Sequence, residues 1–170
     1  MKKSQSGITV TILAVTIIIM AILLGVTMNV STDLLSDTRL KTHISEMLLV
    51  QAKVKSMGET LEFEGAFSSS GALDTDKVAT IGFTNKVGTH ISLNSKYKNQ
   101  VSDEAKSSNR WYKWGANELT QNGFDKDMLT DDEVYFVDYM TGEVVSSTGY
   151  TSIADKATHH YSLQNMIDVK

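Results

Sequence analysis

Five acidic residues lie close together between positions 125 and 133 and form the densest group of potential metal ligands in the chain. Carboxylate oxygens are ligands that calcium prefers in proteins, so this group is a candidate calcium site. The spacing departs from the EF-hand pattern, because the segment 128–130 stands where further ligands and a turn glycine belong. The alternative is a solvated acidic loop that caps a helix. The five residues are Asp125, Asp127, Asp131, Asp132 and Glu133.

Trp111, Tyr112 and Trp114 form the only dense aromatic cluster of the sequence. If these rings are exposed, they provide a surface on which sugars stack or through which the protein adheres. In the alternative interpretation, Trp114 fills the core of the carboxyl-terminal domain beneath a long helix.

The composition excludes several classes of function. With 16 basic and 20 acidic residues the net charge is −4, which argues against nucleic-acid binding by charge attraction. The absence of cysteine excludes a disulfide scaffold, a thiolate metal site and a cysteine nucleophile. His159 and His160 are adjacent, so in a strand they point to opposite faces and cannot share a metal ion. No nucleophile elbow, phosphate loop or zinc-protease motif occurs, and we expect neither an enzyme nor a bound cofactor apart from the candidate calcium.

Apolar residues are concentrated near the amino end of the chain. No charged residue occurs from position 4 to position 32, and residues 8–30 are interrupted only by threonines, one glycine and one asparagine. As a helix, this segment rises about 34 Å, which is enough to cross a hydrocarbon core of about 30 Å. It shows no polar stripe of helical period. The segment therefore predicts a membrane-spanning helix.

The charges that flank this segment predict its orientation. Lys2 and Lys3 precede it, whereas the first charges that follow it, Asp33 and Asp37, are acidic. The positive-inside rule then places the amino terminus in the cytoplasm and everything after residue 30 outside. We expect a single-pass protein of the cell membrane.

The helical pattern continues past the apolar segment. Apolar residues at positions 40, 44, 47, 48 and 54 follow the spacing of an amphipathic helix with one buried stripe. Gly58, preceded by two lysines, is the expected carboxyl-terminal stop. The sequence thus predicts one long helix over 8–58, with 8–30 as its transmembrane and polymerisation segment.

Residues 59–170 have the composition of a soluble, extracellular head. We expect an α+β fold in which the long amino-terminal helix packs on a small antiparallel sheet. The clearest signal is a β-hairpin over 133–147 whose turn at 140–142 contains a glycine. Weaker patterns predict strands at 78–83 and 90–93, a short helix at 114–122 and a serine-capped helical turn at 161–167.

In architecture the whole chain resembles type IV pilins and pseudopilins. The sequence resemblance is strongest at Lys2-Lys3 and Gly7-Ile8-Thr9 and extends through residue 22. The carboxyl-terminal segments WYKWGANELTQNGF, VYFVDYMTGEVV and HYSLQNM are similar to pilin-like proteins of Gram-positive, Firmicutes-type bacteria.

The resemblance implies how the chain is processed and assembled. Residues 1–7 correspond to a prepilin leader, which a prepilin peptidase removes after Gly7 to leave Ile8 as an amino-methylated terminus. The subunits then polymerise with copies of themselves into an extracellular surface filament, with a membrane platform and a cytoplasmic assembly ATPase as partners. Ala14, Ala21 and Gly25 are small enough to let neighbouring helices approach, although in a lone anchor they have no such role.

One departure from the family keeps alternatives open. Most pilins carry a glutamate at the fifth mature residue, where this sequence has Ile12. A buried terminal amine without a partner costs several kcal/mol, so either the hydroxyls of Thr9 and Thr11 with backbone carbonyls replace the acid, or the subunit occupies a tip position. The alternatives to a pilus subunit are a pseudopilin of a type II secretion or DNA-uptake machine, and a non-polymerising single-span protein with an extracellular binding head.

Overall fold

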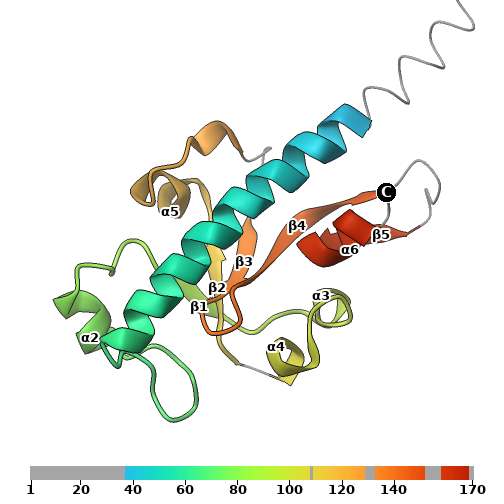
Figure 1. Cartoon of the computed structure of the whole chain (residues 1–170). Helices are drawn as coiled ribbons and strands as arrows, with labels where there is room; N and C mark the ends of the chain where they lie inside the picture. Colours follow the sequence, from blue (N-terminus) through green and yellow to red (C-terminus); the bar gives the residue numbers. More distant parts are fainter. Residues whose placement is uncertain (1–36, 108, 129–132, 152–157, 169–170) are drawn as a thin grey trace, which may run out of the picture. The chain divides into compact units, whose positions relative to one another are not determined.

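The computed structural model describes residues 37–107, 109–128, 133–151 and 158–168 (Figure 1). The predicted leader 1–7 and the predicted membrane segment 8–30, with Gly7, Ile8 and the rest of the polymerisation helix, lie outside these residues. Among the described residues, no helix is both long enough and apolar enough to cross a bilayer. The chain divides into two compact units, residues 1–39 and 40–170. The second unit contains the head.

The head contains one antiparallel sheet of five strands in the order β1-β2-β3-β4-β5, so each strand lies next to its neighbour in sequence (Figure 1). This arrangement confirms the expected α+β class with an antiparallel sheet. The strands are β1 (Thr89–Ile91), β2 (Trp111–Trp114), β3 (Tyr135–Asp138), β4 (Glu143–Thr151) and β5 (His159–Ser162).

The predicted hairpin is confirmed in β3 and β4. Asp138 pairs with Glu143 at the turn end of the two strands, and the amide of Gly142 donates to the carbonyl oxygen of Asp138 at 2.8 Å. Gly142 has φ of +70°, a conformation that a glycine adopts without a steric penalty. Local turn chemistry is therefore sufficient to define this part of the sheet.

A helix over residues 37–63 covers one face of the sheet (Figure 1). Its buried residues recur every three or four positions, which confirms the predicted amphipathic stripe. Leu48 was expected in this stripe, but it is 45 % exposed because its side chain lies about 100° around the helix axis from that of Met47. The buried stripe consists of His43, Ile44, Met47, Val50, Val54, Met57 and Leu61.

The predicted helix end at Gly58 is wrong, because the helix continues to residue 63. Gly58 is buried, and a Cβ atom at this position would overlap the carbonyl oxygen of Tyr139. The glycine is required by the close approach of the helix to the backbone after β3. The helix instead ends before Gly65, which has φ of +61°. The amide of Gly65 donates a hydrogen bond to the Glu62 carbonyl oxygen and closes the last turn.

Short helices connect the strands. The strand expected at 78–83 is wrong, because Asp74 accepts the amide hydrogens of Asp76 and Lys77 and thereby starts a helix there. At the other end of the chain, Ser162 Oγ accepts the amide hydrogen of Asn165 and confirms the serine cap. The helices are α2 (Thr75–Thr80), α3 (Ser95–Lys98), α4 (Asp103–Ser107), α5 (Ala116–Gln121), the 3₁₀ helix η1 (Lys126–Met128) and α6 (Leu163–Asp168).

The two faces of the sheet support separate cores. Toward the 37–63 helix, the sheet presents Tyr135 and Val137 together with Trp114. On the opposite face, Trp111 and Val145 pack against residues of the α3–α4 segment. The alternation of strand residues between the two faces follows the pleat of the sheet.

Replacing Gly58 with alanine tests the close approach of helix and turn. Alanine is better than glycine in a helix by about 1 kcal/mol. The added methyl group must displace a backbone carbonyl, so we expect an overpacking cost near the upper end of the usual range, about 3 kcal/mol. Gly58→Ala should therefore lower the free energy of unfolding, measured by urea unfolding of the full chain. Ser56→Ala, at an exposed position of the same helix, is the control and should not lower it; a Gly58→Ala protein as stable as the parent would contradict the close approach.

Candidate functional site

The predicted aromatic surface is wrong, because all three rings are buried. Trp111 and Trp114 are fully buried, and Tyr112 is nearly so. Trp111 Nε1 donates to the Ala105 carbonyl oxygen at 3.1 Å, and Trp114 Nε1 donates to the Tyr139 hydroxyl at 2.8 Å. These bonds satisfy the indole groups inside the two cores. The alternative, in which Trp114 fills the core beneath the helix, is confirmed.

The acidic group that the sequence marks for calcium is divided by the structure. Asp125 Oδ1 accepts the Asp127 amide hydrogen at 3.0 Å beside η1, and both residues are exposed. Asp131 and Asp132 lie outside the described residues, whereas Glu133 is buried and accepts a hydrogen bond from Ser146 Oγ at 2.6 Å. No cluster of three metal-binding side chains occurs among the described residues. Calcium binding by Asp125 and Asp127 stays a prediction. Glu133 is not expected to be one of the ligands, because it is buried and bonded to Ser146.

Glu133 belongs to a buried polar contact between helix and sheet, which we call the clasp and define as His43, Glu133 and Ser146. His43 stands on the apolar stripe of the helix and is 3 % exposed. Its Nε2 atom lies 3.7 Å from Glu133 Oε1, and its Nδ1 atom lies 3.9 Å from Glu46 Oε2. Ser146 Oγ donates to Glu133 and also accepts the Thr148 amide hydrogen at 3.2 Å. The clasp thus joins the helix to β4.

Aromatic rings complete the buried surroundings of His43. The imidazole lies 4.3 Å from the Tyr150 ring and 6.1 Å from the Tyr135 ring, measured between centroids. Burial lowers the pKa of His43, and the Glu133 carboxylate only partly opposes this fall. Burial and the same carboxylate raise the pKa of Glu46. The helix–sheet interface therefore favours an uncharged imidazole.

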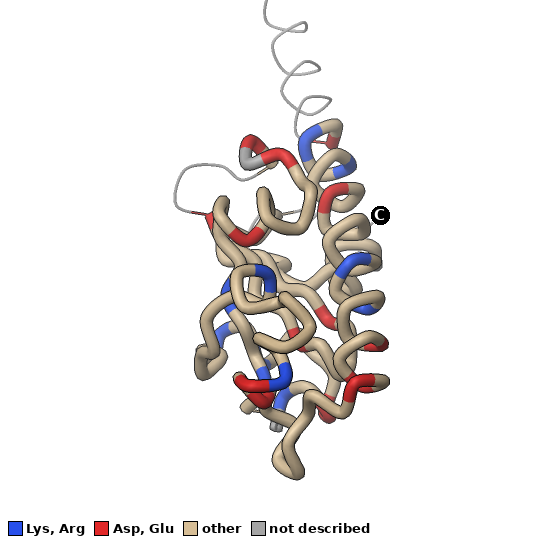
Figure 2. The backbone as a smooth tube through the Cα atoms, turned by 90° about the vertical axis from the view of Figure 1, so that its left-hand side faces the viewer, with Lys and Arg blue, Asp and Glu red and all other residues tan. Residues whose placement is uncertain are grey.

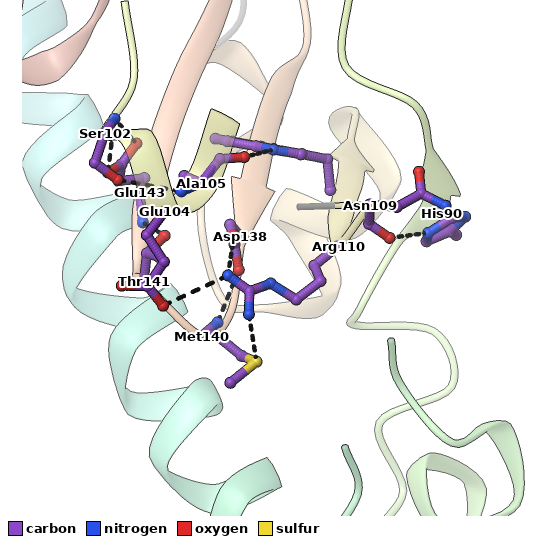
Figure 3. A network of polar contacts seen from close by, with 11 residues as sticks. His90, Ser102, Glu104, Ala105, Asn109, Arg110, Asp138, Met140, Thr141 and Glu143 are labelled. Atoms are coloured by element: carbon purple, nitrogen blue, oxygen red, sulfur yellow. Dashed lines mark hydrogen bonds and ion pairs between the residues drawn. The ribbon is translucent and has the colours of Figure 1, made fainter. Parts of the chain in front are cut away.

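A second polar network, the turn network, lies beneath the β3–β4 turn and consists of Glu104, Arg110, Asp138 and Met140 (Figure 3). Arg110 Nη2 lies 3.6 Å from the fully buried Asp138 and 3.6 Å from Glu104. Arg110 Nη1 donates to the Met140 sulfur at 3.0 Å, and the Met140 amide donates to Asp138 at 2.9 Å. A buried carboxylate requires such partners, so the network fixes the turn to the start of β2.

Two surface grooves flank the helix. The first, called the α6 groove, has a volume of about 520 Å³ and separates the middle of the helix from α6 and the α3–α4 connection. Its apolar wall includes Leu48, Val101, Leu163 and Ile167.

The second groove, called the turn groove, has a volume of about 500 Å³. It lies between the end of the helix and the β3–β4 turn, where Glu59, Glu62, Phe67 and Met140 contribute to its lining. Both grooves offer docking volume on the surface of the head.

The comparison of this chain with profiles of known protein families, with curated proteins and with solved structures gave no match. Function must therefore be inferred from the residues and their geometry.

The sequence did not predict the clasp. The signal for His43 was present, because it lies four residues before Met47 and thus on the apolar stripe. Its partners Glu133 and Ser146 are distant in sequence, and only tertiary packing brings them to the helix.

Because His43 is buried in the clasp, we expect the stability of the head to depend on pH. Below the ordinary histidine pKa of 6.5, the unfolded chain binds a proton at His43 that the folded chain does not. Stability should therefore fall as pH decreases from 7 to 5.5, by at most about 1.4 kcal/mol per pH unit for one proton. The raised pKa of Glu46 acts in the opposite direction, because the folded chain then binds its proton first as pH falls toward 4.5.

His43→Gln should reduce this pH dependence, measured as the melting temperature at several pH values in that interval. His90→Gln, which removes an exposed imidazole on β1, is the matched control. An unchanged pH dependence in the His43→Gln protein would show that the clasp does not titrate in this way.

Proposed function

We propose that this chain is the structural subunit of a type IV pilus-like surface filament. The prepilin peptidase cuts after Gly7, and residues 8–30 anchor the subunit in the membrane before they polymerise. One observation carries the proposal: an uncharged apolar segment is followed within seven residues by a helix that lies along an antiparallel sheet. This order joins a lipid-compatible segment to a water-exposed head through an amphipathic helix.

The packing of the helix supports a mechanical role. Its stripe is buried in the core of the head, so force applied to the helix acts on the whole sheet. The clasp at His43 and the contact of Gly58 with Tyr139 hold it at two places. Such a head can transmit load without a hinge between helix and sheet.

The outer side of the helix supports assembly. Leu49 is 58 % exposed and Phe63 is 89 % exposed, and Leu48 is also exposed. The hydroxyl groups of Ser45 and Thr60 donate to carbonyl oxygens of their own helix, so they need no water as partner. An exposed surface with large apolar side chains and satisfied hydroxyls favours contact with another protein surface.

A second candidate within the same class is a minor or tip subunit, or a pseudopilin. It is favoured by Ile12, because the apolar segment contains no acid that could pair with a buried terminal amine. A tip position leaves the amine unburied. The abundance of the protein in surface material removed by shearing distinguishes a major subunit from a minor one.

Gly7→Val tests the proposed processing. A side chain next to the cut obstructs the extended strand that must enter the peptidase, so the variant should keep its leader and fail to assemble. Mass spectrometry should find methylated Ile8 as the first residue of the parent protein, and sheared surface material should contain filaments of it.

Ser4→Val changes the leader away from the cut and is the control, which should be processed normally. A parent protein that begins at Met1 and stays monomeric in the membrane would refute the filament proposal. It would favour the non-polymerising single-span protein with a binding head.

A further inference from the structure

The last turn of the helix presents an apolar tip within an acidic surrounding. Phe63 is 89 % exposed, more than the other large exposed apolar side chains of the described residues. Glu62 and Glu64 flank it, and both are exposed. Carboxylates are unfavourable at the carboxyl end of a helix, because they add to the negative end of its dipole. The exposed phenyl group and these acids therefore do not stabilise the isolated head.

The α6 groove offers five apolar side chains within a largely polar lining. Its volume of about 520 Å³ exceeds what one phenyl ring requires. Leu48 of the helix and Ile167 of α6, both partly exposed, line it. Val101 and Leu163 add further apolar wall. The groove can therefore bury an aromatic ring that is left exposed elsewhere.

Lysines of the helix lie outside the lining of the α6 groove and carry the charge opposite to that around Phe63. Lys41 and Lys55 lie seven residues before and after Leu48, which places all three on nearly the same side of the helix. The one acidic side chain of the groove lining, Glu143, accepts the Ser102 amide hydrogen at 3.2 Å. Figure 2 shows basic and acidic residues interspersed along the helix and acidic residues at its end.

We propose that the Phe63 tip of one copy docks into the α6 groove of a second copy of this chain. The ring lies against the apolar side chains of the groove, and Glu62 and Glu64 lie near the lysines of the neighbouring helix. The inference rests on the proposed filament for its biological setting and specifies which surfaces of the heads meet.

Because the tip and the groove lie at different places on each copy, the contact can repeat from one copy to the next. Phe63 and Leu48 are fifteen residues apart, which corresponds to about 22 Å along the helix axis and about 60° around it. The two surfaces are therefore separate patches of each copy, and each copy can use its tip and its groove at the same time. A contact between different patches is heterologous, and when its rotation does not close a ring it generates an open helical array.

Site-specific cross-linking tests the contact, because the natural chain has no cysteine. Full-length Phe63→Cys and Leu48→Cys variants are produced together in one cell and treated with a short bis-maleimide. We expect a covalent dimer that requires both variants and is absent when either is produced alone. Phe63→Cys together with Ser56→Cys is the matched control, because Ser56 is exposed on the same helix but does not line the groove.

The outcomes separate this inference from the filament proposal. Filaments with a processed Ile8 terminus but no Phe63–Leu48 cross-link would overturn the contact and leave the filament proposal standing. A dimer of Phe63→Cys alone would also overturn it, because the tips would then meet each other. The expected cross-link without filaments would support the contact and refute the filament. The absence of cross-link, processing and filaments would refute both.

Alanine variants provide a second measurement. Phe63→Ala should reduce the yield of sheared filaments by about tenfold or more, since it removes a buried aromatic ring from each contact. Its melting temperature should stay unchanged, because the ring is exposed in the head. Ser56→Ala changes an exposed side chain of the same helix outside the groove and should leave the yield within about twofold of the parent. Equal losses in both variants would overturn a specific role for the tip.

Discussion

The structure of the head depends on the packing of one apolar helix stripe against one face of the sheet. An isolated helix of this length is marginal in water, and a small sheet needs a covered face to be stable. Met47, Val50 and Val54 are fully buried in the same core as Tyr135 and Val137. Each such side chain contributes about 1.5–3 kcal/mol as an upper estimate. Without this interface neither element would keep its form.

Apolar packing has no direction, so it does not by itself determine where the helix lies along the sheet. Two specific contacts supply this information. Near the start of the described helix, His43 meets Glu133, and near its end Gly58 allows the backbone of Tyr139 to come close. Both contacts are costly if misaligned, one because it separates buried polar groups and the other because atoms overlap. Together they determine where the helix lies along the sheet.

The difference between non-directional apolar packing and specific contacts also applies to the assembly of the proposed filament. In the proposed filament, residues 8–30 exchange lipid contacts for protein contacts, which gains no large hydrophobic term. The specificity and much of the strength of assembly must then come from the heads, where apolar side chains leave water. The exposed residues of the helix, above all Phe63, provide surface for such contacts. Such head contacts can hold the subunits together and still allow the filament to disassemble.

The sequence alone determined the elements whose signals are local. The amphipathic period of the helix, the glycine turn between β3 and β4 and the serine cap of α6 are each contained within a few neighbouring residues. The strand predicted at 78–83 failed because the capping capacity of Asp74 outweighed the apolar content of the segment. Only tertiary structure decided that Trp111 and Trp114 are buried, that Gly58 lies inside the helix and that Glu133 faces His43. Each of these outcomes depends on a contact between residues far apart in the chain, and local periodicity carries no information about such contacts.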